Sequence, residues 1–268
     1  MRLLPLLATI CLGLSSCDDT PRQWHPTATI ELGTVTPIGL AYYQNQLWIA
    51  DGDHNQLVAI DDTGQTAKTA TDFERPMHID AADGALYIPE YGSDQIIVYR
   101  NGQKSVLPLA DSLDAPAGVS VFGEQIAIAD FYNHRIVYFD GKVWSAFGQE
   151  GKGLGSLYYP TDVQILSDKI VVADAYNNRI QVFDKAGKAT RLIGEADGMN
   201  AATGLYADDA EIWVTDFEND RVLRYDHDGK LLQTISEGLQ KPTDILKVDN
   251  ELYIANYKGN NLIVYNQK

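Results

Sequence analysis

The sequence predicts an all-β protein folded as a six-bladed β-propeller, and two periodic features indicate this fold class. A short apolar segment ending in Asp, Glu or Asn occurs six times, and successive end residues are 39, 40, 44, 42 and 40 positions apart. A second motif, Pro-x-x or Ala-x-x, precedes each segment, and its third residue stands twelve positions before the end residue in all six copies. Short strands repeated about every forty residues are typical of propeller blades.

Each repeat can be divided into four expected strands. The Pro-x-x motif begins the innermost strand, and the apolar segment is the second strand, which is apolar at consecutive positions because neighbouring blades bury both of its sides. A third strand such as residues 179–184 follows, then a turn containing Gly, then a more polar fourth strand. The third motif residues, which we expect at the mouth of the central channel, are Gly39, His78, Gly118, Asp162, Gly204 and Asp244.

The two ends of the chain predict how the ring closes. The last repeat stops after its third strand, whereas residues 28–33 precede the first repeat and carry the apolar-Gly ending seen at Ile193-Gly194. We expect residues 28–33 to complete the sixth blade by pairing with residues 262–265. Residues 27–268 would then form one closed propeller without a free sheet edge.

The N-terminal segment predicts export. Residues 1–16 contain Arg2, an apolar stretch and two serines before Cys17, and the stretch is too short for a stop-transfer helix. Leu14-Ser15-Ser16-Cys17 resembles the lipobox of bacterial lipoproteins, which implies cleavage before Cys17 and attachment of fatty acyl chains such as palmitate. Residues 17–26 would be a lipidated tether, and the protein would be anchored to a bacterial membrane, facing the periplasm or the cell exterior. The alternative is an ordinary secretory signal.

Charge and motifs exclude several function classes. Acidic residues outnumber basic ones 37 to 21, which gives a net charge of −16 and disfavours nucleic acid as a partner. Only Cys11 and Cys17 are present, so a disulfide framework is not expected. The sequence contains no Gly-x-Ser-x-Gly, His-Glu-x-x-His or Cys-x-x-Cys motif, so nucleophilic catalysis has no visible candidate.

Residues 130–136, 174–180 and 216–222 place Asp, Asn and Arg at matching positions, and this pattern resembles the signature of NHL repeats. The resemblance covers about residues 28–266 and implies an NHL-type six-bladed propeller. The first, second and sixth copies depart from it, with Gln56, Gln95 and Asn261 in place of Arg. We expect the Asp and Arg side chains to pair and brace each blade. The resemblance predicts the fold and says little about chemistry.

Two groups of residues could form a site at the channel mouth. His78, Asp162 and Asp244 offer one imidazole and two carboxylates at a common height, which suits a divalent cation such as zinc or calcium. The alternative is that the aspartates bond backbone N–H groups. The second group is a set of aromatic residues in the loops of the same face, which could bind a ligand or pack against adjacent blades: Tyr91, Phe131, Tyr132, Tyr176, Phe217 and Tyr257.

Two functions follow from these groups. The first is a membrane-anchored, non-catalytic module of the cell envelope that binds a protein, peptide or small-molecule ligand on its aromatic face. The second is a metal-dependent lyase or hydrolase that acts at the channel mouth through His78, Asp162 and Asp244. The missing catalytic motifs favour the first function.

Overall fold

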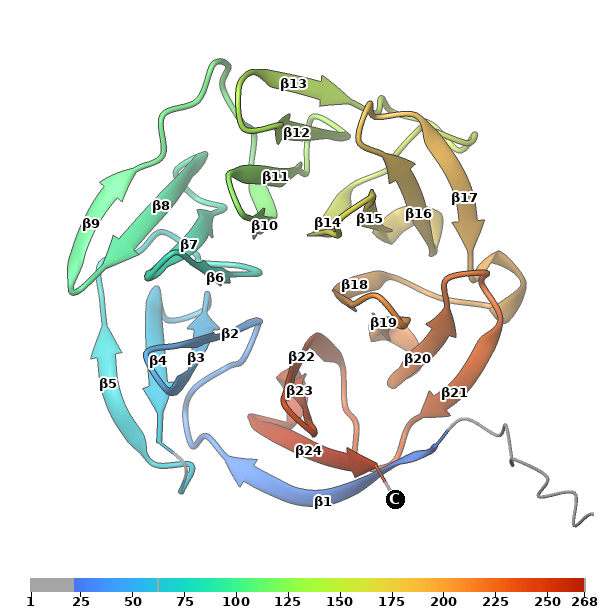
Figure 1. Ribbon diagram of the computed structural model, residues 1–268. Coiled ribbons are helices and arrows are strands. Elements are labelled where there is room, and N and C mark those ends of the chain that lie inside the picture. The colour runs from blue at the N-terminus through green and yellow to red at the C-terminus, as the bar shows by residue number, and fades with distance from the viewer. Residues whose placement is uncertain (1–21, 62, 268) are drawn as a thin grey trace, which may run out of the picture.

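The computed structural model describes residues 22–61 and 63–267, and it shows six four-stranded antiparallel sheets around a central opening (Figure 1). In order from the channel outward, the strands of the first three blades are β2 (Gly39–Tyr43), β3 (Gln46–Asp51), β4 (Gln56–Ile60) and β5 (Thr66–Ala70); β6 (Asp80–Ala82), β7 (Ala85–Glu90), β8 (Gln95–Arg100) and β9 (Gln103–Val106); β10 (Pro116–Phe122), β11 (Gln125–Asp130), β12 (Arg135–Phe139) and β13 (Trp144–Phe147). The strands of the last three blades are β14 (Pro160–Ile165), β15 (Lys169–Asp174), β16 (Arg179–Asp184) and β17 (Ala189–Ile193); β18 (Ala202–Ala207), β19 (Glu211–Asp216), β20 (Arg221–Asp226) and β21 (Leu231–Ile235); β22 (Pro242–Val248), β23 (Glu251–Asn256), β24 (Asn261–Gln267) and β1 (Trp24–Glu31).

The predicted ring closure is confirmed. β1 pairs with β24, and Ala28, Thr29 and Ile30 lie opposite Val264, Ile263 and Leu262. Figure 1 shows this N-terminal strand, in blue, beside the C-terminal strand, in red. The sixth sheet therefore joins both ends of the described chain, and each blade has two neighbours.

β1 begins earlier than predicted, at Trp24 rather than at residue 28, and ends at Glu31. Trp24 is only 2% exposed and packs edge-on against Trp213 of the fifth blade, with 5.7 Å between ring centroids. Its backbone exchanges two hydrogen bonds with the Gln233 side chain of the same blade, at 3.0 and 2.8 Å. Residues 24–26, which we expected in the tether, are therefore part of the folded ring.

The core consists of clusters between neighbouring blades, because both faces of each second strand are covered. In β15, for example, Val171 packs in the cluster between the fourth and fifth blades, and Val172 packs in the cluster between the third and fourth. The outer strands β5 and β9 are exposed or half-buried along their whole length. This burial on both faces explains why the second strand of each repeat is apolar at consecutive positions, whereas the outer strands are more polar.

The helical segments are single turns in the loops: η1 (Ala175–Asn177), η2 (Glu195–Asp197), η3 (Phe217–Asn219) and η4 (Tyr257–Gly259). In the part of the chain that the structure describes, no helix is long and apolar enough to cross a membrane. Cys17, the predicted signal segment 1–16 and residues 17–21 of the predicted tether 17–26 lie outside the described residues.

Candidate functional site

One end of the central channel is surrounded by the third residues of the six Pro-x-x or Ala-x-x motifs. Glycines from the first, third and fifth blades alternate with polar residues from the second, fourth and sixth: Gly39, His78, Gly118, Asp162, Gly204 and Asp244. A Cβ atom added to Gly204 would lie 2.1 Å from the carbonyl oxygen of Thr243 and 2.6 Å from the Cα of Asp244. Only glycine allows this approach, so the alternation is a packing requirement of the innermost strands.

The two aspartates of this ring connect neighbouring blades. One carboxylate oxygen of Asp162 accepts a hydrogen bond from the Leu205 N–H of the fifth blade at 2.8 Å, and one oxygen of Asp244 accepts from the Leu40 N–H of the first blade at 2.7 Å. The second oxygen of each accepts from the N–H of the following residue at 2.8 Å. These carboxylates therefore bond backbone N–H groups, as the alternative predicted, but one bond of each crosses to the next blade and does not stay within the same turn. Both residues also line the channel.

His78 lies between the two aspartates, and the three residues can hold a metal ion because their ligand atoms lie within 4.8 Å of one another. Its Nδ1 atom is 3.7 Å from Asp244 Oδ1 and 3.9 Å from Asp162 Oδ2, which is too far for hydrogen bonds. This Nδ1 atom is buried and has no hydrogen-bond partner among the described residues. The name triad is used below for His78, Asp162 and Asp244.

The electrostatics of the triad follow from burial and mutual proximity, since each residue is at most 5% exposed. Burial raises the pKa of Asp162 to about 8, and the nearby Asp244 carboxylate adds to this rise while His78 opposes it. Burial disfavours the imidazolium form of His78, but the two carboxylates outweigh it and raise the pKa of the imidazole above its ordinary value. The triad is thus a site where a positive charge is strongly favoured.

The strand pattern did not reveal one more carboxylate in the channel. Asp80 accepts hydrogen bonds from the N–H groups of Ala81 and Val121, both at 2.7 Å, so it links the second blade to the third. Burial raises the pKa of Asp80 to about 6. His78 keeps the position that the motif predicts, because Pro76 bridges to Glu90 as Pro116 does to Asp130. Strand β6 begins only at Asp80, and His78 also bridges to Gly118 of the next blade.

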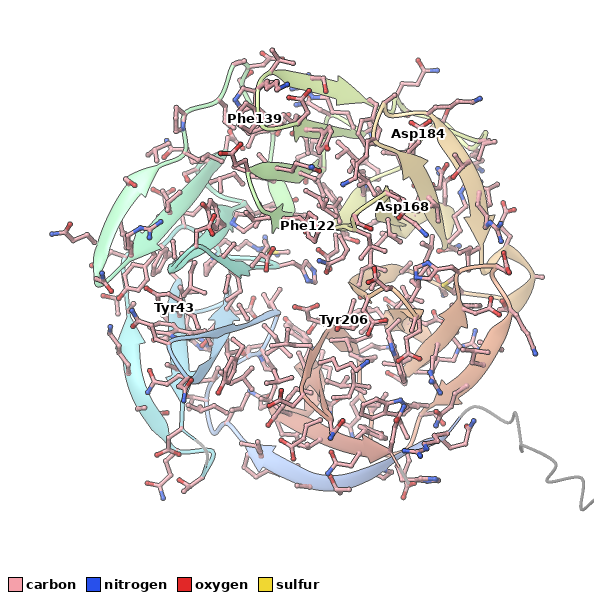
Figure 2. All side chains as sticks on the ribbon, in the orientation of Figure 1. Tyr43, Phe122, Phe139, Asp168, Asp184 and Tyr206 are labelled. Carbon is pink, nitrogen blue, oxygen red and sulfur yellow. The ribbon has the colours of Figure 1, made fainter. Side chains whose placement is uncertain are left out.

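The channel beside the triad is narrow. Its cavity measures about 40 Å³ and is lined by the triad, Asp80, Gln164 and mostly apolar residues in or beside the innermost strands. Phe122 is the last residue of β10, and Tyr206 is the second-last residue of β18. Figure 2 shows both close to the central opening. Such a volume admits an ion with a water molecule and excludes an organic molecule.

The Asp and Arg pairs brace the blades, as predicted. Arg179 Nε donates to Asp174 at 2.9 Å, and the corresponding pairs in the third and fifth blades measure 2.7 and 2.6 Å. Asp174 is fully buried, and its other oxygen accepts the Tyr158 N–H at 2.7 Å. In the first blade His54 and Gln56 replace the Asn and Arg of the signature and bond Asp51 at 2.8 and 2.9 Å.

A much larger cavity, which we call the funnel, opens on the face where the innermost strands begin. It measures about 570 Å³, and its lining residues come from the second to fifth blades: Arg75, Phe131, Thr161, Ala175, Tyr176, Asn178, Asn200, Ala201, Thr203, Phe217 and Glu218. Three of the six predicted aromatic residues, Phe131, Tyr176 and Phe217, belong to this lining. The funnel lies next to the triad, because Thr161 lines the funnel and Asp162 lines the channel.

The other three predicted aromatic residues stand around these. Tyr91 and Tyr132 contact Phe131, with ring centroids 5.8 and 5.1 Å apart, and Tyr257 lies 6.3 Å from Phe217. Tyr257 also donates its hydroxyl to Asp53 at 2.8 Å. The rings therefore pack against one another across blades, as one interpretation predicted. Tyr132 and Tyr176 nevertheless remain exposed, as ligand binding would require.

Sequence reasoning missed three further members of this surface. Tyr159 lies 4.8 Å from Phe131 and 4.9 Å from Tyr176, and His134 stacks on Tyr158 at 5.3 Å. Tyr158 and Tyr159 come just before the Pro-x-x motif of the fourth blade, where the sequence gives no sign of side-chain direction. Arg75, which lines the funnel, occupies the same position before the motif of the second blade.

Comparisons with known proteins support this architecture. Residues 155–268 match a family model described as DUF5128: 6-bladed beta-propeller. No curated protein sequence matches the chain. Many solved structures match the chain, and three of them, each 16% identical in sequence, are described below.

Three solved structures illustrate the likeness. A streptogramin B lyase structure is 16% identical with a TM-score of 0.66, over 91% of this chain and 98% of that one. A catalytically inactive virginiamycin B lyase from Staphylococcus aureus with quinupristin gives 16% and 0.67, over 91% and 88%. A gluconolactonase from Xanthomonas campestris gives 16% and 0.72, over 90% and 89%. These likenesses confirm the six-bladed propeller and extend to the fold alone.

Proposed function

We propose that the protein is a binding module that takes a small organic ligand into the funnel. The observation that carries this proposal is the cavity of about 570 Å³ lined by Phe131, Tyr176 and Phe217. Small-molecule sites are typically concave, a few hundred Å³ in volume, and combine aromatic walls with a few polar groups. Asn178 and Asn200 supply such polar groups here.

The funnel lining favours binding over catalysis. Its threonine hydroxyls are engaged, since Thr161 donates to the carbonyl oxygens of Ala202 and Thr203 at 3.0 and 2.9 Å, and the Thr203 hydroxyl bonds that of Thr215 at 2.7 Å. Its carboxylate, on Glu218, pairs with Lys241 at 3.1 Å. A nucleophile activated by an adjacent base, as acyl or glycosyl transfer needs, is not among the lining residues.

Binding can be tested with a panel of aromatic fragments followed by ligand-observed NMR. We expect fragments that bind wild-type protein to show less than half of that saturation-transfer signal with the Phe217→Ala variant. Phe122→Ala is the matched control, because Phe122 is 47% exposed and lies at the far end of β10, away from the funnel. Equal binding to both variants, or the failure of all fragments to bind, would contradict the proposal.

A second proposal is that the triad binds one divalent cation that links the second, fourth and sixth blades. It is supported by the convergence of three ligand atoms and by the unpartnered Nδ1 atom of buried His78. One imidazole and two carboxylates suit zinc, and calcium would need additional oxygen ligands. Because the adjoining cavity has only about 40 Å³, the geometry favours a structural cation over the metal-dependent lyase or hydrolase that the sequence also suggested.

Elemental analysis tests the cation directly. We expect about one equivalent of metal after incubation with zinc or calcium, together with a rise in the thermal unfolding midpoint. Both effects should disappear in His78→Ala and persist in the matched control His54→Ala, whose imidazole lies outside the channel. Metal far below one equivalent, with no thermal shift, would remove this proposal.

We also propose that the blades are NHL repeats and that the protein is exported and anchored to a bacterial membrane through acylated Cys17. The Asp, Asn and Arg pattern of the third to fifth blades and the lipobox-like segment before Cys17 support these proposals. Labelling of cells with an alkyne analogue of palmitate tests the anchor. Wild-type protein should take up the label and sediment with membranes, whereas Cys17→Ser should do neither.

A further inference from the structure

One cation of the funnel has no anionic partner. Within the described part of the chain, no carboxylate oxygen lies within 4 Å of the Arg75 guanidinium, although other arginines, such as Arg135, Arg179 and Arg221, each pair with a buried aspartate. The absence is unexpected in a chain with a net charge of −16. Arg75 is therefore available to an anion that enters the funnel.

The position of Arg75 is fixed by its surroundings. Its backbone N–H donates to the Asn55 side chain at 2.9 Å, and its carbonyl oxygen accepts the Tyr91 N–H at 3.1 Å. Its guanidinium lies 4.9 Å from the centroid of the Tyr91 ring, a cation–π distance. This arrangement places a planar donor group at the funnel wall, and its side-chain N–H groups have no hydrogen-bond acceptor among the described residues.

The sixth blade provides an internal comparison. Lys241 precedes the Pro-x-x motif there, as Arg75 does in the second blade, and both residues have a positive φ, 56° in each case. Lys241, however, is neutralised by Glu218 at 3.1 Å and Asp220 at 3.5 Å. The same pairing engages Glu218, so the uncompensated charge that faces the funnel is the positive charge of Arg75.

We propose that the ligand of the funnel is a carboxylate attached to an aromatic or other flat apolar body. Arg75 binds the carboxylate, since a guanidinium and a carboxylate form two parallel hydrogen bonds. Phe131, Tyr176 and Phe217 pack against the apolar body. This inference rests on the proposed function of the funnel and adds the chemical class of the ligand.

Indoleacetate, indoleacetamide and tryptamine test the inference by isothermal titration, because they share one ring and carry a negative, a neutral and a positive group. We expect indoleacetate to bind wild-type protein about tenfold or more tightly than the other two. Arg75→Gln should abolish that preference and leave the affinity for indoleacetamide unchanged. The matched control Lys258→Gln also removes a cation that lies over an aromatic ring of this face, but Lys258 is outside the funnel lining, so this variant should retain the preference.

The outcomes separate the two proposals. If indoleacetamide or tryptamine binds as tightly as indoleacetate, or if Arg75→Gln retains the preference, carboxylate recognition is refuted while ligand binding in the funnel stands. If none of the three compounds binds, the ligand class is refuted, and the fragment panel alone decides on the funnel. If Phe217→Ala weakens none of the compounds that bind, the funnel is not the binding site and both proposals fail. Circular dichroism of each variant verifies that the fold is retained.

Discussion

Trp24 offers a direct test of the closure of the ring by β1. Replacing it with alanine removes a side chain that is 2% exposed and its edge contact with Trp213 at 5.7 Å. Truncation of a buried tryptophan typically lowers the free energy of unfolding by about 3–5 kcal/mol. For a chain of this length a urea m-value of about 3 kcal/mol per molar is reasonable, so the urea midpoint should fall by about 1.3 M.

Far-UV circular dichroism is the suitable signal for this titration, because it does not depend on tryptophan fluorescence. Trp144→Ala is the control, since Trp144 is half-buried on outer strand β13 and contacts Phe139 at 5.1 Å within its own blade. Its loss should be clearly smaller. If Trp24→Ala loses less than about 1 kcal/mol, or no more than Trp144→Ala, then packing of β1 on the fifth blade does not hold the ring closed.

Three further predictions follow from the ring and its braces. Gly204→Ala should destabilise the protein by about 1–3 kcal/mol, because the new Cβ would overlap the backbone of the next blade. The control Gly153→Ala, where the Cβ meets open space, should change the thermal unfolding midpoint little. Arg179→Met should cost about 3–5 kcal/mol in urea titrations, since it leaves the fully buried Asp174 without its cationic partner. The hydrogen bond and charge of Asp51 raise the pKa of His54, so an NMR titration should give a midpoint above the ordinary value. The resulting stabilisation should be complete below about pH 6.5 and lost as the pH rises through that midpoint, and an unshifted midpoint would contradict it.

The blades could be predicted from the sequence because their signal is local and repeated. The apolar second strand and the motif twelve residues before its end occur in six copies, so an error in one copy is corrected by the others. The closing strand was predictable for a related reason, since residues 28–33 supply the fourth strand that the last copy lacks. Residues 24–27, the first four of β1, could not be predicted as strand. Trp24 is buried by contacts with the fifth blade, which the local sequence does not reveal, and a polar segment containing Pro26 is typical of a tether.

The candidate site was only partly predictable, because its members depend on contacts between blades. The triad followed from matching positions, whereas Asp80 was not predicted because it lies two residues after the motif, at the position that Ser120 has in the third blade. The funnel was missed as a cavity, although half of its expected aromatic residues line it. Arg75 and Tyr159 point into this region from backbone positions with positive φ, a conformation that no sequence pattern indicated.

The direction of β1 decides which way the molecule would face at a membrane. Trp24 lies opposite Gln267 and Glu31 lies opposite Asn261, and Asn261 in turn pairs with Asn256 at the funnel end of the sixth blade. The polypeptide therefore enters the ring on the side remote from the funnel. Trp24 stands seven positions after Cys17, so the chain between them reaches at most about 25 Å. An acyl anchor on Cys17 would thus hold the back of the disc near the bilayer and turn the aromatic opening outward, so that it would sample solutes from the aqueous phase and not lipids.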